Sequence, residues 1–184
     1  MGTDKATLVV EGERLAHRAA RVLGEVCYPA LEVGPGVSGL QAVCEDPPGG
    51  GPLAALLAGA SALGVAPVLL LAVDLPFVSA ALLALIAGWP GDGAVVPVVG
   101  GRAQHVCARY GREALAQAEA LYSAGERSLR WVCEVPGTLL LDEESMRAVA
   151  SDRSFADLDS PDDLRRWGLQ SSSGTGTVGD SQVT

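Results

Sequence analysis

The chain has 184 residues, a formal net charge of −9, 48% hydrophobic residues and only 4% aromatic residues. This length supports one domain whose sizeable core is built mainly from Leu, Val and Ala. The negative charge argues against nonspecific nucleic-acid binding and against attraction to acidic membranes. No apolar run has the length of a membrane span, no signal peptide opens the chain, and the four cysteines form no C-x-x-C pair. We therefore expect a cytoplasmic protein with reduced cysteines.

The first third of the chain predicts one helix and two short strands. Residues 12–23 place apolar side chains on one helical face and arginines on the opposite face. Short strands are expected at residues 29–33 and 40–43. Lys5 lies before these elements, beside Asp4, where a lone lysine is usually only a solvated charge.

A glycine-rich segment follows the second predicted strand. Glu45 and Asp46 precede the sequence PPGGGP at residues 47–52, and a small apolar helix is expected at residues 53–63. A glycine-rich turn before a helix N-terminus is a possible anion site. It lacks the spacing of a P-loop, and a flexible surface connection is the competing interpretation.

The centre of the chain is the sequence PVLLLAVDLPFV at residues 67–78. Its continuous apolar run predicts a strand buried on both faces, as in parallel sheets covered by helices. Asp74 follows that run, at the strand end where open α/β sheets bind ligands. Because Ser79 is the better N-cap for the next helix, we expect Asp74 to hold a hard cation such as Mg²⁺, with substrate phosphates as further ligands.

The remainder of the chain continues the alternation of strands and helices. Strands are expected at 93–99, 104–110 (carrying His105), 138–141 and 155–158, and helices at 80–87, 113–121, 125–133, 142–149 and from Ser160. This order predicts a three-layer α/β fold with a mostly parallel, Rossmann-like sheet. We expect one domain over residues 1–169 and a disordered tail over residues 170–184.

Several segments, taken in order, resemble the molybdenum cofactor guanylyltransferase family of nucleotidyltransferases. MGTDKATL resembles the end of the family signature L-A-G-G-x-S-x-R-M-G-x-D-K-x-x-L, and Glu45-Asp46 with the following GPLA resembles its E-D…G-P-L-A-G segment. AVDLPF resembles C-D-x-P-[FY], AGER at 124–127 matches a family motif, and FADLDSPDDL resembles F-x-N-x-N-T-P-E-D-L. The resemblance spans nearly the whole chain except the tail.

The resemblance implies transfer of GMP from GTP to molybdenum-bearing molybdopterin, with Mg²⁺ as cofactor and diphosphate as product. Lys5 and Asp46 would contact the nucleotide, and Asp74 would bind Mg²⁺ and so hold the phosphates. Substrate contacts are implied, less directly, for three further residues: His105, Asp157 and Asp159. The family usually has asparagines at the last two positions, so the acids here change the available hydrogen-bond donors. Molybdoenzymes or cofactor-insertion proteins are the implied partners.

The start of the chain departs from the family pattern. The first strand and its L-A-G-G-x-S-x-R loop are absent, and a mis-assigned start codon is the preferred explanation, with a genuine truncation as the alternative. We then expect the strands near Ala30 and Leu70 to lack a shared neighbour, and the chain as written to be poorly soluble or molten and not to bind GTP. Cytidylyl or other nucleotidyl transfer, or a non-catalytic cofactor-handling role, are the alternative functions.

Overall fold

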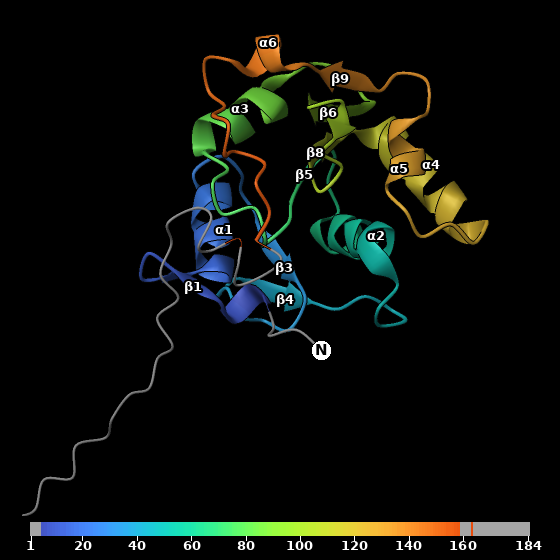
Figure 1. The fold of residues 1–184 in the computed structure, drawn as a ribbon. Helices are drawn as coiled ribbons and strands as arrows, with labels where there is room; N and C mark the ends of the chain where they lie inside the picture. Colours follow the sequence, from blue (N-terminus) through green and yellow to red (C-terminus); the bar gives the residue numbers. More distant parts are fainter. Residues whose placement is uncertain (1–4, 159–162, 164–184) are drawn as a thin grey trace, which may run out of the picture.

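The computed structural model describes residues 5–158 and Asp163. The helix predicted from Ser160, the tail at 170–184 and Asp159 lie outside these residues. The elements in chain order are η1 (Lys5–Thr7), β1 (Val9–Val10), β2 (Glu13–Arg14), α1 (Leu15–Gly24), β3 (Leu31–Val33), β4 (Gln41–Val43), α2 (Gly51–Leu63), β5 (Val68–Leu71), α3 (Ala80–Gly88), β6 (Ala94–Val99), β7 (Arg102–Ala103), β8 (Cys107–Tyr110), α4 (Arg112–Ser123), α5 (Arg130–Cys133), β9 (Leu139–Leu141) and α6 (Glu143–Met146) (Figure 1).

The strands form one main sheet and two small ones. The main sheet has the order β5-β8-β6-β7, with β9 also paired to β6, whereas β1 pairs with β2 and β3 with β4. Among the described strands, β3–β4 and β6–β9 are parallel and the other pairs are antiparallel. The prediction of a mostly parallel sheet was therefore wrong. After β7 the chain folds back, so that β8 lies between β5 and β6 and pairs antiparallel with both.

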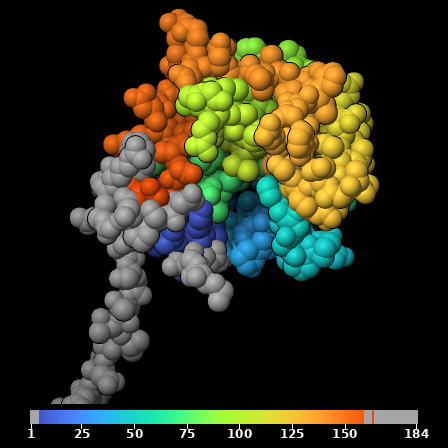
Figure 2. Space-filling view, turned by 45° about the vertical axis from the view of Figure 1, so that its right-hand side comes forward, coloured from blue at the N-terminus to red at the C-terminus, as the bar shows by residue number. Residues whose placement is uncertain are grey.

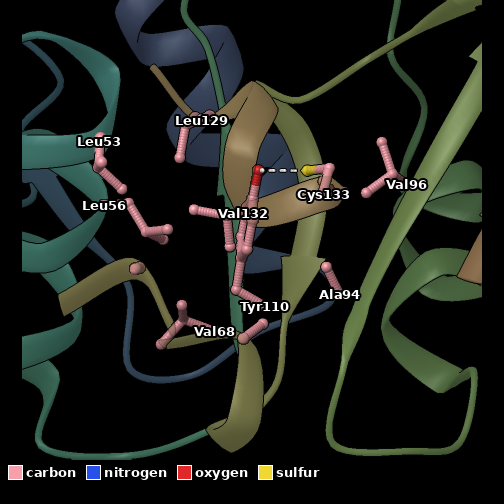
Figure 3. Packing of buried hydrophobic residues seen from close by; sticks show 12 residues of the cluster. Leu53, Leu56, Val68, Ala94, Val96, Tyr110, Leu129, Val132 and Cys133 are labelled. Atoms are coloured by element: carbon pink, nitrogen blue, oxygen red, sulfur yellow. Dashed lines mark hydrogen bonds between the residues drawn. The ribbon is translucent and has the colours of Figure 1, made fainter. Parts of the chain in front are cut away.

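Helices cover both faces of the main sheet, as expected for three layers. On β6, Ala94 and Val96 pack with α2, α4 and α5, whereas Val95 packs on the opposite face with α1, α3 and α6. This is the two-residue alternation of a strand that is buried on both sides. Tyr110 of β8 is fully buried in the first cluster, where its hydroxyl lies 3.8 Å from Cys133 Sγ (Figure 3). The sheet is thus the middle layer of a packed core.

The small sheet of β3 and β4 lies apart from the main sheet, between α1 and α2 (Figure 1). A Cβ added at Gly59 of α2 would lie 3.1 Å from Val33 Cγ2, so the missing side chain lets this helix pack closely on β3. The residues of β3 are nonetheless only half-buried, and Gln41 and Ala42 of β4 are exposed. This sheet is consequently the less protected part of the described fold.

Several local predictions need correction. A β1–β2 hairpin was missed, although Glu11-Gly12, with φ of 52° and 82°, forms the tight turn typical of hairpins. Residues 155–158 form a turn and loop rather than a strand, His105 lies in the turn before β8, and the predicted helix at 125–133 is reduced to α5. Among the described helices, none is both long and apolar enough to cross a membrane.

Candidate functional site

The site is centred on an ion pair between the first and the central segments of the sequence resemblance. Lys5 Nζ lies 3.1 Å from Asp74 Oδ2, and their side chains are 37% and 26% exposed. Asp74 does not directly follow β5, which ends at Leu71, but lies in the turn that leads to α3. That helix begins with Ser79 as N-cap, because the Ser79 hydroxyl oxygen accepts the Leu82 N–H at 3.2 Å. The Asp74 carboxylate is therefore not used as a helix cap.

Three segments distant in sequence form the floor under this pair. Val10, Leu15 and Leu158 are almost fully buried and pack together with partly buried side chains that include Val73 and Phe77. The Leu158 N–H also donates to the Asp74 carbonyl oxygen at 3.0 Å. Since these contacts fix the backbone on both sides of Asp74, the carboxylate is held at a defined place while its oxygens reach solvent.

Two charged residues border this floor from the C-terminal segment. Asp157 precedes Leu158 and is exposed. The Arg153 guanidinium carbon lies 5.9 Å from the centroid of the Phe77 ring, within cation–π distance. Arg153 was missed in the sequence, where no motif marks it. The structure thus places a cation, Arg153, beside Phe77 at the border of this floor.

The glycine-rich turn is organised by Glu45 rather than by Asp46. The Glu45 carboxylate accepts the Gly50 N–H at 2.8 Å, directly before α2, whereas Asp46 is exposed in the loop from β4. Gly49 and Gly51 have φ of 78° and 84°, which glycine adopts without strain. The Gly50 N–H before α2 is thus already bonded to Glu45.

His105 lies in the turn before β8, and the neighbouring Val106 carbonyl accepts the Ala72 N–H at 2.7 Å. The charged groups that act on its ring, however, are Arg130 of α5 and Glu134, which directly follows this helix. Burial and then the positive charge of Arg130 lower the pKa of His105. The imidazole is therefore biased toward its neutral form.

Glu32 of β3 is a further ordered carboxylate, which sequence reasoning missed. Its oxygens accept the backbone N–H groups of Gly36, Val37 and Ser38 at 2.8, 3.0 and 2.7 Å. Burial raises the pKa of Glu32, but hydrogen bonds from Ser38 and the neighbouring N–H groups outweigh it, so the pKa is lowered overall. The G-P-G turn after β3 was the available signal. This carboxylate fixes the loop at the end of β3.

The described residues contain no cluster of three or more His, Cys, Asp or Glu side chains able to hold a metal ion. Mg²⁺ is commonly bound through one or two carboxylates together with substrate phosphates and water. A single accessible carboxylate such as Asp74 fits that mode of binding, and it does not fit a metal site built from protein ligands alone.

Comparison with solved structures defines the class of this fold as mixed α/β of the type found in molybdopterin-guanine dinucleotide biosynthesis protein A. The crystal structure of that protein from Archaeoglobus fulgidus has a TM-score of 0.74 at 20% identity and covers 90% of this chain and 89% of its own. A putative protein from Aquifex aeolicus VF5 has a TM-score of 0.67 at 12% identity, covering 79% of each chain. At these identities the likeness concerns the fold alone.

The sequence then gives the particular family. The chain belongs to the family described as MobA-like NTP transferase domain, whose model matches residues 1–137. A relative from Chloroflexus aggregans is 33% identical, covering 89% of this chain and 85% of its own length. One from Opitutus terrae is 38% identical, covering 82% and 77%. Both relatives are named probable molybdenum cofactor guanylyltransferase.

Proposed function

We propose that this protein transfers GMP from GTP to molybdenum-bearing molybdopterin and releases diphosphate. The observation that carries the proposal is the Lys5–Asp74 pair, which joins the first and the central family-like segments at one place. The names of the two curated relatives support the same substrates.

In this reaction, a phosphate oxygen of the acceptor attacks the α-phosphorus of GTP. The bond from that phosphorus to the oxygen bridging to the β-phosphate breaks, and diphosphate leaves with the electron pair. Such chemistry depends on positioning and on charge stabilisation rather than on a covalent catalyst. Bound Mg²⁺ would neutralise charge on the phosphates.

The charged residues of the chain would bind different parts of the metal–nucleotide complex. The Lys5 ammonium group would bind nucleotide phosphate as a point charge, and the Asp74 carboxylate would hold Mg²⁺. In the structure these two groups neutralise each other, so substrate binding would exchange one ion pair for two interactions with the metal–nucleotide complex. Asp46 is proposed to face the nucleotide, and Asp157, Asp159 and His105 to contact the acceptor.

The test is to incubate the protein with Mg²⁺, GTP and molybdenum-bearing molybdopterin and to measure diphosphate and the nucleotidylated product. It is run on residues 1–184 and, where the gene carries an in-frame upstream segment, on the longer chain. CTP in place of GTP measures the choice of base. A product formed equally well from CTP would favour cytidylyl transfer instead.

The Asp74→Asn variant should lose at least about 100-fold in transfer rate, since it removes the only charge assigned to the metal. Lys5→Ala should raise the KM for GTP or lower kcat. Glu119→Gln, at an exposed position on α4, is the matched loss of a carboxylate and should leave the rate unchanged. Undiminished diphosphate release by Asp74→Asn would exclude the proposed metal ligand.

A further inference from the structure

Strand β9 pairs only with β6 among the described strands, and it therefore lies at an edge of the main sheet. The direction of the backbone groups in β6 follows from one hydrogen bond. The Gln104 N–H donates to the Pro97 carbonyl at 2.8 Å, on the side of β6 that faces β7 and β8. Because backbone groups alternate in direction along a strand, those of Val96 face the other side, where β9 lies.

The parallel register of β9 on β6 leaves the backbone of Leu140 facing away from the sheet. Val96 lies opposite Leu140. In a parallel pair, the N–H and C=O groups of one residue bond to the two neighbours of its partner, which here are Leu139 and Leu141. The N–H and C=O groups of Leu140 consequently point outward. Within the described residues, neither group has a hydrogen-bond partner.

The side chain of Leu140 is exposed as well. Its exposed fraction is 56%, whereas Leu139 is half-buried and Leu141 is almost fully buried in the cluster under α3 and α6. In Figure 2 the orange residues that follow α4 form the top of the molecular surface, where no other described segment covers them. Sheet edges are commonly protected by charged residues or proline. The centre of this edge instead carries an uncharged leucine.

Helix α5 lies near this edge on one face of the sheet. Since Leu140 is paired with Val96, its side chain shares the face that α2, α4 and α5 cover. On that face α4 packs on β8 and α5 packs on β6, so α5 is the helix nearest to β9 (Figure 1). It carries Trp131, which is 42% exposed. The edge thus combines free backbone groups with two exposed apolar side chains on neighbouring elements.

The acidic side chains that directly follow β9 are engaged within the chain. The Asp142 carboxylate accepts the Ser145 N–H at 2.9 Å as the N-cap of α6. The Glu143 carboxylate accepts the Gly100 N–H at 2.7 Å, in the turn between β6 and β7. These two carboxylates are therefore held by local partners and are not directed at the free edge.

A second copy of the chain fits this edge better than a separate peptide does. The free edge is short, because Pro136 lacks an N–H, Gly137 turns the chain with φ of 87°, and α6 begins at Glu143. An extended peptide would gain only the hydrogen bonds of Leu140. A second copy related by a twofold axis gains the same bonds, because the donor and acceptor of Leu140 meet the acceptor and donor of Leu140 of the partner subunit. It also brings a second α5 to the same face.

We propose that this protein forms a symmetric dimer in which the β9 strands of two copies pair antiparallel, centred on Leu140. The two main sheets would then form one continuous sheet, with both copies of α5 on one face. Because the paired edge is short, the dissociation constant should be about 1–100 µM. The proposal does not depend on the proposed enzymatic function, since no residue assigned to GTP, Mg²⁺ or acceptor binding lies on β9 or α5.

The first test measures the mass of residues 1–184 by sedimentation equilibrium at about 5 to about 200 µM protein. The unchanged chain should pass from monomer to dimer as the concentration rises. Leu140→Lys and Leu140→Glu should each weaken the dimer at least about tenfold, because two like charges then lie opposite each other. An equal mixture of the two variants should restore the dimer, since each lysine then lies opposite a glutamate.

The matched controls are Ala84→Lys and Ala84→Glu, which place the same charges at an exposed position of α3. Both should dimerise as the unchanged chain does. An unchanged chain that is monomeric at every concentration would overturn the proposal, and so would a dimer that persists in Leu140→Lys. A mixture of the two Leu140 variants that stays monomeric would exclude antiparallel pairing centred on this residue.

Amide hydrogen exchange of the unchanged chain gives a second measurement that needs no variant. Raising the protein concentration should slow exchange of the Leu140 N–H at least about tenfold. The Leu141 N–H already bonds to β6, so it serves as the internal control and should change little. Equal exchange of Leu140 in dilute and concentrated solution would overturn the proposal, even if a dimer forms through another surface.

Discussion

The main sheet and the small sheet contain similar strand-forming residues but differ in burial. The first four residues of β6 and all four of β8 are buried, whereas β3 is half-buried and β4 is mostly exposed. β6 and β8 have neighbours at both edges and helices on both faces. The comparison teaches that burial of a strand here depends on its neighbours more than on its own hydrophobicity.

The largest expected difference comes from truncating a leucine in each region. Leu83 on α3 is fully buried against the main sheet, and Leu83→Ala should lower the free energy of unfolding by about 2–5 kcal/mol. Leu31→Ala, in half-buried β3, should cost only about 1 kcal/mol. Urea denaturation measures both.

Equal losses of stability in the two variants would show that the small sheet is as well packed as the main one.

The expectation that the chain as written is molten remains a prediction. If residues 1–184 show no cooperative unfolding transition in urea, the main sheet lacks fixed packing as well as the small sheet.

Two glycine substitutions should change stability in opposite directions. A Cβ at Gly111, which precedes α4, would overlap the backbone of Asp92, so Gly111→Ala should destabilise the protein by about 1–3 kcal/mol. At Gly24, the last residue of α1, a Cβ meets no atom within 4 Å, and Gly24→Ala should stabilise by about 0.4–1 kcal/mol. Thermal unfolding should show Tm falling in the first variant and rising in the second.

The smallest expected effect is a pH dependence in the main-sheet region. The pKa of His105 is lowered from 6.5 by burial and by Arg130. As the pH falls, His105 is therefore protonated at a higher pH in the unfolded chain than in the folded chain. Its contribution favours folding above about pH 6.5 and decreases as the pH falls toward the lower pKa of the folded state. Acidification should therefore destabilise the unchanged chain more than His105→Gln, as measured by the urea midpoint at about pH 7.5 and about pH 5.5. Equal changes in both would exclude this histidine as the cause.

Local features of the fold could be predicted because they depend on neighbouring residues. Ser79 was recognised as the N-cap of α3, and the helix predicted at 142–149 is found as the shorter α6, with Asp142 as its N-cap. The Asp142 carboxylate accepts the Ser145 N–H at 2.9 Å. The order of strands could not be predicted in this way. The apolar runs of β5 and β6 do not reveal that β8 separates them, because pairing depends on contacts distant in sequence.

The same division applies to the candidate site. Lys5 and Asp74 were selected from short motifs, and the structure brings them together, while their catalytic roles remain predictions. Arg153 was not found, because a cation beside Phe77 follows only from the three-dimensional arrangement. Glu32 was also not found, although the G-P-G turn after β3 was an available signal for a loop that binds its carboxylate.

The contacts of Asp74 also have a consequence for the order of folding. Lys5 is 69 positions away from Asp74, and the second contact reaches Leu158 near the other end of the described chain. Pairings at such sequence separation cost more loop-closure entropy and form more slowly than local ones such as the hairpin that joins β6 to β7. We therefore expect the part of the main sheet formed by β6, β7 and β8, which pair close in sequence, to form first and the Lys5–Asp74 site to be completed last. A chain trimmed by proteolysis at either end would then keep much of its core and lose the site.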